Sequence, residues 1–184
     1  AVVVKFGGSA MEDKATVDNV LKDVAFMECV GLRPVLVHGG GKAISQKMKD
    51  AGLRPVFVKG LRVTDDESIR IVEQVLNDEV NPEIVKSLEE FGCKARGIHG
   101  EHILFVKKHT ERDPDTAEVL DWGYVGDVMK VDVEPIKAYL QAGITPVITP
   151  LGLGPDRKLY NINADEVAAA IAEKLEARKL VFLS

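Results

Sequence analysis

The stretch RPVLVHGGGKAIS, Arg33 to Ser45, decides the fold class of this chain. An apolar run, Val35 to Val37, is followed by three consecutive glycines, Gly39 to Gly41, and then directly by a helix-like pattern. Glycine loses more backbone entropy on folding than any other residue, so three in a row indicate a sharp bend or a close approach of another group to the backbone. A buried strand that leads through glycines into a helix is typical of an α/β protein.

The same order recurs along the chain. Apolar strands are expected at Val2–Phe6, Ile144–Ile148 and Leu180–Leu183, with helices between strands at both ends of the chain. In the middle, PVFVK and LRVT are separated by Gly60, which predicts a short hairpin. We therefore expect an α/β fold with an open, mainly parallel sheet sandwiched between helices, and a β-hairpin region. Ligands of such sheets bind at the carboxyl ends of the strands.

Three local expectations concern the middle of the chain. The pattern Thr64–Glu67 (TDDE) fits a capping box that starts a long helix. Pro82 is expected to kink or break that helix. The polar stretch His109–Asp121 is expected to be a loop.

Composition limits the classes of function. The 184 residues fit one domain, 46% of them are hydrophobic, and 29% are charged. The net charge of −5 argues against a nucleic-acid partner. No apolar run approaches the ~20 residues that a membrane-spanning helix needs. Cys29 and Cys93 are expected to be reduced and buried, as in a cytoplasmic protein.

Three strand ends carry loops that fit an anion site. Lys5, Gly7 and Gly8 follow or end the first strand, and the glycine triplet follows the second. Glycines before a helix expose backbone N–H groups, and the helix start adds partial positive charge. Tight turns that need positive φ are the alternative explanation. Neither loop has the spacing of a Walker or a Rossmann motif.

Charged and amide side chains complete the candidate site. Lys5 ends an apolar strand, where a lysine beside a phosphate could stabilise a transferring phosphoryl group. Arg62, on the hairpin, offers a fork that suits a carboxylate. Asn161, Asn163 and Asp165 alternate before a helix, so an extended backbone would direct all three to one face. Helix capping explains one of them, but not three.

The pair His99 and His102 has the look of a metal site. Two histidines without a third ligand are more often loop residues, and we assign no metal ligand in this chain.

Six segments together carry a resemblance to a known family. They are VVKFGGSA, LVHGGGKAIS, VKGLRVTD, GYVGDV, ITPVITPLG and YNINADEVAAAIA. In this order they resemble the amino acid kinase superfamily, with its carbamate-kinase-like fold, and within it the N-acetylglutamate kinases. The KFGG opening is shared with aspartokinases.

The resemblance implies an activity and a set of roles. The family uses ATP, with Mg²⁺ on the nucleotide, to phosphorylate the side-chain carboxylate of N-acetyl-L-glutamate, which yields N-acetyl-L-glutamyl 5-phosphate in arginine biosynthesis. The implied catalytic residues are Lys5 and Asp165. The implied phosphate-binding residues are Lys5, Gly7, Gly8 and Gly40, and the implied substrate-binding residues are Gly39, Gly40, Gly41, Arg62, Asn161 and Asn163.

The resemblance also bears on organisation. Residues 1–184 correspond to an N-terminal acetylglutamate-binding and dimerisation domain, and an ATP-binding C-terminal domain is expected beyond them. A homodimer or higher homo-oligomer is expected, with the helix Asp66–Phe91 as a candidate interface. A typical serine-glycine-lysine-aspartate pattern is absent around GIHGEHILF.

Two other functions stay open at this point. One is another kinase of the same fold, such as an aspartokinase. The other is a non-catalytic amino-acid-binding module.

Overall fold

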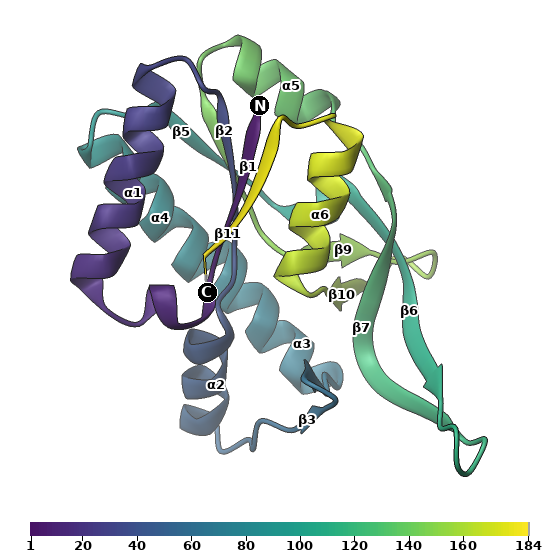
Figure 1. The fold of residues 1–184 in the computed structure, drawn as a ribbon. Coiled ribbons are helices and arrows are strands. Elements are labelled where there is room, and N and C mark those ends of the chain that lie inside the picture. Colours follow the sequence, from purple (N-terminus) through teal and green to yellow (C-terminus); the bar gives the residue numbers. More distant parts are fainter. Residues whose placement is uncertain (184) are drawn as a thin grey trace.

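A parallel sheet forms the centre of the protein. The computed structural model describes residues 1–183 and places five strands in the order β11–β1–β2–β8–β5, all parallel (Figure 1). Their bounds are β1 Val2–Phe6, β2 Pro34–His38, β5 Ala95–Ile98, β8 Thr145–Ile148 and β11 Lys179–Leu183. The predicted open parallel sheet is confirmed.

Helices cover both faces of this sheet, as Figure 1 shows. α1 (Lys14–Cys29) and α4 (Asn81–Glu90) lie on one face, and α5 (Glu134–Gln141) and α6 (Ala164–Lys174) on the other. Strand side chains alternate between the faces, so Leu36 packs in the cluster of α1 and α4. By the same alternation Lys5 faces α6, whereas His38 faces α4.

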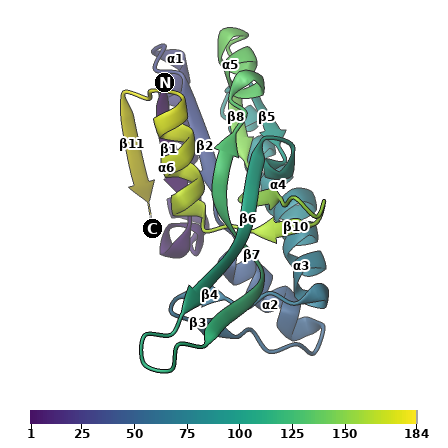
Figure 2. The same ribbon diagram turned by 90° about the vertical axis from the view of Figure 1, so that its right-hand side faces the viewer.

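A second, smaller set of strands lies beside the main sheet. Its strands pair in a closed ring, β10–β7–β6–β9, and β6 and β7 extend from it as a long arm (Figure 2). Their bounds are β6 Leu104–Arg112, β7 Val119–Val131, β9 Leu151–Leu153 and β10 Leu159–Asn161. The prediction of a loop over His109–Asp121 is wrong, because the β6–β7 ladder continues to Arg112 and Val119.

The predicted hairpin is confirmed as β3 (Phe57–Val58) and β4 (Leu61–Arg62). Its two turn residues, Lys59 and Gly60, both have positive φ, as a tight hairpin turn requires. Trp122 of β7 donates its indole N–H to the Val58 carbonyl at 3.0 Å. The hairpin is thereby attached to the arm.

One long helical stretch follows the hairpin. It consists of α3 (Asp66–Glu73), a π-helical segment η2 (Gln74–Val80) and α4. The cap is Asp65, which accepts from the Ser68 N–H, and not the expected Thr64. Pro82 does not break the helix, because it lies at the start of α4, where its missing N–H costs little.

The remaining helices are short. They are α2 (Gly41–Asp50) and the single 3₁₀ turns η1 (Gly8–Met11) and η3 (Gly100–His102). Cys93 is buried as expected, but Cys29 is exposed, and both thiols are free. Among the helices of residues 1–183, none combines the length and the apolarity needed to cross a membrane.

Candidate active site

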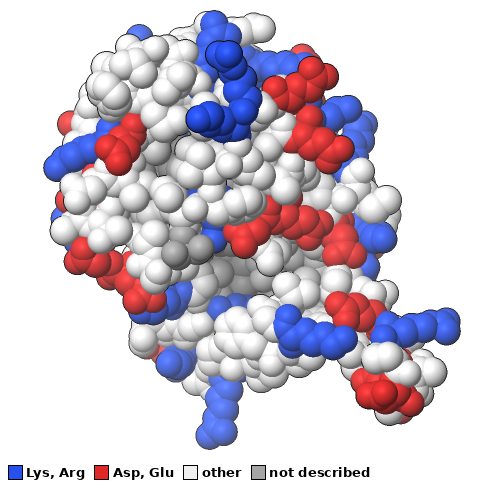
Figure 3. All heavy atoms as spheres, viewed as in Figure 1, with Lys and Arg blue, Asp and Glu red and all other residues white. Residues whose placement is uncertain are grey.

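The carboxyl ends of β1 and β2 bring the two glycine loops into contact. The Gly39 N–H donates to the Phe6 carbonyl at 2.8 Å. A Cβ placed on Gly39 would lie 3.4 Å from the Cα of Gly7, so the two loops pack backbone against backbone. Figure 3 shows the surface hollowed in this region, between α6 and the part that holds α2 and β3.

Lys5 and Asp165 meet above the first glycine loop. Lys5 is 7% exposed, and its Nζ lies 3.1 Å from Oδ1 of Asp165 in the first turn of α6. A Cβ on Gly7 would lie 3.0 Å from Cε and 3.1 Å from Nζ of Lys5. Gly7 is therefore needed for the position that the lysine takes.

The glycine triplet is required for space and not for a left-handed backbone. Gly39, Gly40 and Gly41 all lack positive φ, and Gly40 is extended at −179°. A Cβ on Gly40 would lie 2.7 Å from Cδ2 of the buried Leu76. Gly8, in contrast, has φ of 58°, so the turn explanation holds there.

Two adjoining cavities share the triplet. One, of about 280 Å³, is lined by Lys5, Gly8, Ser9, Glu12 and Lys42 together with the triplet. The other, of about 220 Å³, is lined by Phe57, Arg62, Leu76, Asn161 and Pro150 together with the triplet. Asn163 and Ala164 also line both. The arrangement is one continuous site with a cationic group at each end.

Arg62 supplies the positive charge of the second cavity. Its guanidinium is 6% exposed and donates to the Gly41 carbonyl at 2.9 Å and to Ser45 Oγ at 2.8 Å. The ring of Phe57 lies 4.6 Å from the guanidinium carbon. Arg62 forms no ion pair with any carboxylate of residues 1–183, and burial lowers its pKa, although it stays protonated. A buried cation held in place without a carboxylate partner is suited to an anionic ligand.

The three polar residues of the NINAD stretch have different roles. Asn161 ends β10 and lines the Arg62 cavity. Asn163 is the N-cap of α6 and accepts the Asp165 N–H at 2.9 Å. The expectation of one extended face is wrong, because α6 begins at Ala164 and Asp165 already belongs to the helix. The helix brings Asp165 to Lys5 instead.

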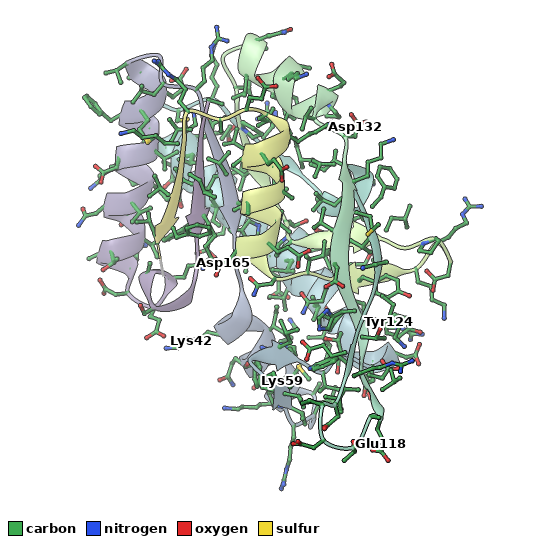
Figure 4. All side chains as sticks on the ribbon, turned by 45° about the vertical axis from the view of Figure 1, so that its right-hand side comes forward. Lys42, Lys59, Glu118, Tyr124, Asp132 and Asp165 are labelled. Carbon is green, nitrogen blue, oxygen red and sulfur yellow. The ribbon has the colours of Figure 1, made fainter. Side chains whose placement is uncertain are left out.

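Several lining residues were not singled out from the sequence. Lys42 forms an ion pair of 2.6 Å with Glu12, which links the start of α2 to η1 across the first cavity. Figure 4 shows Lys42 at the start of α2, below Asp165 at the start of α6. Ser45, one turn after the triplet, orients Arg62, and its position on the helix face of Gly41 was the available signal.

The two histidines near η3 are not part of this site. The rings of His99 and His102 stack at 5.9 Å, and His99 lies 3.7 Å from Glu101. Within residues 1–183, no group of three or more His, Cys, Asp or Glu side chains is arranged to hold a metal ion.

Comparison with known proteins decides the family. The model of the amino acid kinase family matches residues 1–184. The chain belongs to the amino acid kinase family. An acetylglutamate kinase from Symbiobacterium thermophilum is 44% identical over 185 residues, which cover all of this chain and 63% of that protein. The chain therefore spans less than two thirds of the length of this curated relative.

Solved structures agree with the fold. The Streptococcus mutans protein smu.665 has a TM-score of 0.85 and 29% identity, covering all of this chain and 71% of that one. N-acetylglutamate synthase from Neisseria gonorrhoeae, solved with coenzyme A and N-acetyl-glutamate, has a TM-score of 0.81 and 26% identity. The match covers all of this chain and 41% of the synthase.

Proposed function

We propose that the protein carrying this chain transfers the γ-phosphate of ATP to the side-chain carboxylate of N-acetyl-L-glutamate. The product is N-acetyl-L-glutamyl 5-phosphate, an intermediate of arginine biosynthesis, and the enzyme works in the cytoplasm. The observation that carries the proposal is the buried Arg62 guanidinium, which has no carboxylate partner in residues 1–183 and shares one continuous site with Lys5. The 44% identical acetylglutamate kinase supports this acceptor.

The residues divide into an acceptor end and a phosphate end. Arg62 and Asn161 bind the α-carboxylate end of the acceptor, and Asn163 lines the path between the two ends. The acceptor side chain then lies over the glycine triplet, where exposed N–H groups can bind oxygens. Lys5, with Gly7 and Gly8, binds the γ-phosphate of ATP, which brings its Mg²⁺ with it.

The chemistry needs no covalent intermediate. An oxygen of the ionised acceptor carboxylate attacks the γ-phosphorus, the bond from that phosphorus to the bridging oxygen breaks, and ADP leaves with the electron pair. No proton has to be removed from the nucleophile. Catalysis then consists of alignment and stabilisation of charge on the phosphoryl oxygens, which Lys5 supplies. Asp165, at 3.1 Å, fixes the position of the lysine ammonium.

Organisation is part of the proposal. Residues 1–184 form the N-terminal acetylglutamate-binding and dimerisation domain, and the additional length of the relatives holds the ATP-binding domain. The protein assembles as a homodimer or higher homo-oligomer, with the helical stretch of α3, η2 and α4 as the candidate interface. Light scattering of the full natural chain, with charged substitutions on this stretch, tests the assembly.

One experiment separates the three candidate functions. Coupled ADP release is measured on the full natural chain with Mg²⁺-ATP and either N-acetylglutamate, glutamate or aspartate. Turnover confined to N-acetylglutamate supports the proposal, and turnover on aspartate indicates an aspartokinase instead. Calorimetric binding of N-acetylglutamate without any turnover indicates a binding module, the alternative favoured by the likeness to the synthase.

A further inference from the structure

His38 is the last residue of β2 and directly precedes the glycine triplet. Its side chain is 0% exposed and faces α4, on the opposite side of the sheet from Lys5. Buried polar rings need hydrogen-bond partners, because an unsatisfied buried group costs about 1–3 kcal/mol. The partners of His38 connect the triplet to the first residue of α4, Asn81.

The partners determine which ring nitrogen carries the proton. Nδ1 lies 2.7 Å from the Gly39 carbonyl oxygen, which can only accept, so Nδ1 is the protonated nitrogen. The amide nitrogen of Asn81 lies 3.0 Å from the Val147 carbonyl and 3.1 Å from Nε2 of His38. This NH₂ group donates one hydrogen to each, so Nε2 accepts. The assignment follows from the network of partners.

Asn81 is itself held on every side. It begins α4 where the π-helical segment ends, a kind of irregularity that is frequent near functional sites. Its Oδ1 lies against Gly97 of β5, where any Cβ would overlap that oxygen. The amide therefore cannot turn without losing both the Val147 carbonyl and the imidazole.

The bond to the Gly39 carbonyl sets the direction of the next N–H. A trans peptide is planar, and its C=O and N–H point in opposite directions. With the Gly39 oxygen directed at His38, the Gly40 N–H points away from the ring. Gly40 lines both cavities, and its N–H donates to no acceptor in residues 1–183.

We infer that the buried His38–Asn81 pair is a positioning element for phosphoryl transfer, which holds the Gly39–Gly40 peptide so that the Gly40 N–H faces the reacting phosphoryl oxygens. The inference rests on the proposed function for the identity of the ligand, but the geometry of the peptide does not. An N–H fixed in advance stabilises charge that develops on an oxygen without reorganisation during the reaction.

Burial agrees with the neutral ring. It lowers the pKa of His38 to about 4, against a smaller opposite effect of the bond to Gly39, and no charged side chain contributes to the shift. A protonated ring would direct an Nε2–H at the NH₂ group of Asn81, donor against donor. The network therefore has one consistent arrangement of protons at neutral pH.

The kinetic test uses the full natural chain with three variants. His38→Leu removes the donor, His38→Asn keeps an N–H near the position of Nδ1, and Val35→Ala is a matched control that removes packing from the same buried strand. We expect His38→Leu to lower kcat by about 10- to 100-fold, below the ~10²–10³ of a deleted oxyanion donor, with the acceptor KM changed less than about threefold. His38→Asn should recover most of this loss, and Val35→Ala should lower only the melting temperature. Equal kcat in His38→Leu and Val35→Ala would overturn the inference.

A second measurement does not depend on turnover. The ¹⁵N–¹H spectrum of the wild-type imidazole should show the Nδ1–H tautomer of His38, without titration between about pH 5.5 and 7.5. The Gly40 amide resonance should shift in His38→Leu and stay in place in Val35→Ala. An Nε2–H tautomer, or an unmoved Gly40 resonance, contradicts the inference. If these signals are as expected while no acceptor is phosphorylated, the proposed function fails and the positioning of the peptide stands.

Discussion

Arg62→Lys probes the acceptor end of the site most directly. The substitution keeps a positive charge but removes the planar fork, and with it the two bonds to the Gly41 carbonyl at 2.9 Å and Ser45 Oγ at 2.8 Å. The ammonium would also lose its guanidinium contact with the Phe57 ring. A lysine at this position can bind a carboxylate through one hydrogen bond, where arginine offers two parallel ones.

The magnitude follows from the loss of one charged hydrogen bond in a nearly dry site. Such a bond contributes about 1.5–3 kcal/mol, which corresponds to a roughly 10- to 150-fold weaker acceptor affinity. The exposed Arg54 is the matched control, because Arg54→Lys makes the same change of side chain outside both cavities. Its affinity should stay within about twofold of wild type.

Isothermal titration of N-acetylglutamate into the full natural chain measures both variants. A melting curve of each variant shows whether the site is still folded at the temperature of the titration. Equal affinities of a folded Arg62→Lys protein and the wild type would refute the assignment of Arg62 to the acceptor carboxylate.

Three further outcomes are expected. Gly7→Ala should displace the Lys5 ammonium by a few tenths of an ångström, because the new Cβ would lie 3.0 Å from Cε, and coupled ADP release should show kcat reduced by roughly tenfold or more at an unchanged melting temperature. Asp165→Asn should lower kcat much more than the acceptor affinity, while the denaturant midpoint hardly changes, since the partner carboxylate is 55% exposed; a parallel fall in affinity would contradict this role. Because folding lowers the pKa of His38 from 6.5 to about 4, its neutral form stabilises the fold fully above about pH 6.5, and about 3 kcal/mol of unfolding free energy should be lost as the pH falls to about 4. Denaturant titrations of wild type and His38→Asn over this range check the last point, and identical pH profiles would count against it.

Much of the main sheet was predictable because its strands are buried on both faces. β1 and β2 are buried at every position, so they show in the sequence as continuous apolar runs between glycine-rich turns. The arm of β6 and β7 was not predictable in the same way. Beyond Lys108 its residues are largely exposed, and backbone pairing across the ladder holds it without an apolar face.

The candidate site was predictable where its chemistry lies in short motifs. Lys5, the glycine triplet and Arg62 all lie at the cavities, and their types alone indicated anion binding. The pair of His38 and Asn81 was not found, because the two residues are 43 positions apart and meet only when α4 packs on the sheet. No local pattern reports a contact of this kind.

The attachment of the hairpin to Trp122 has an optical consequence. Trp122 is the one tryptophan of this sequence, is 1% exposed, and bonds through its indole to Val58 on the hairpin that carries Arg62. Any movement of the hairpin upon acceptor binding changes the surroundings of this single fluorophore. Intrinsic fluorescence of the chain thus offers a label-free, stopped-flow record of how fast the acceptor pocket closes.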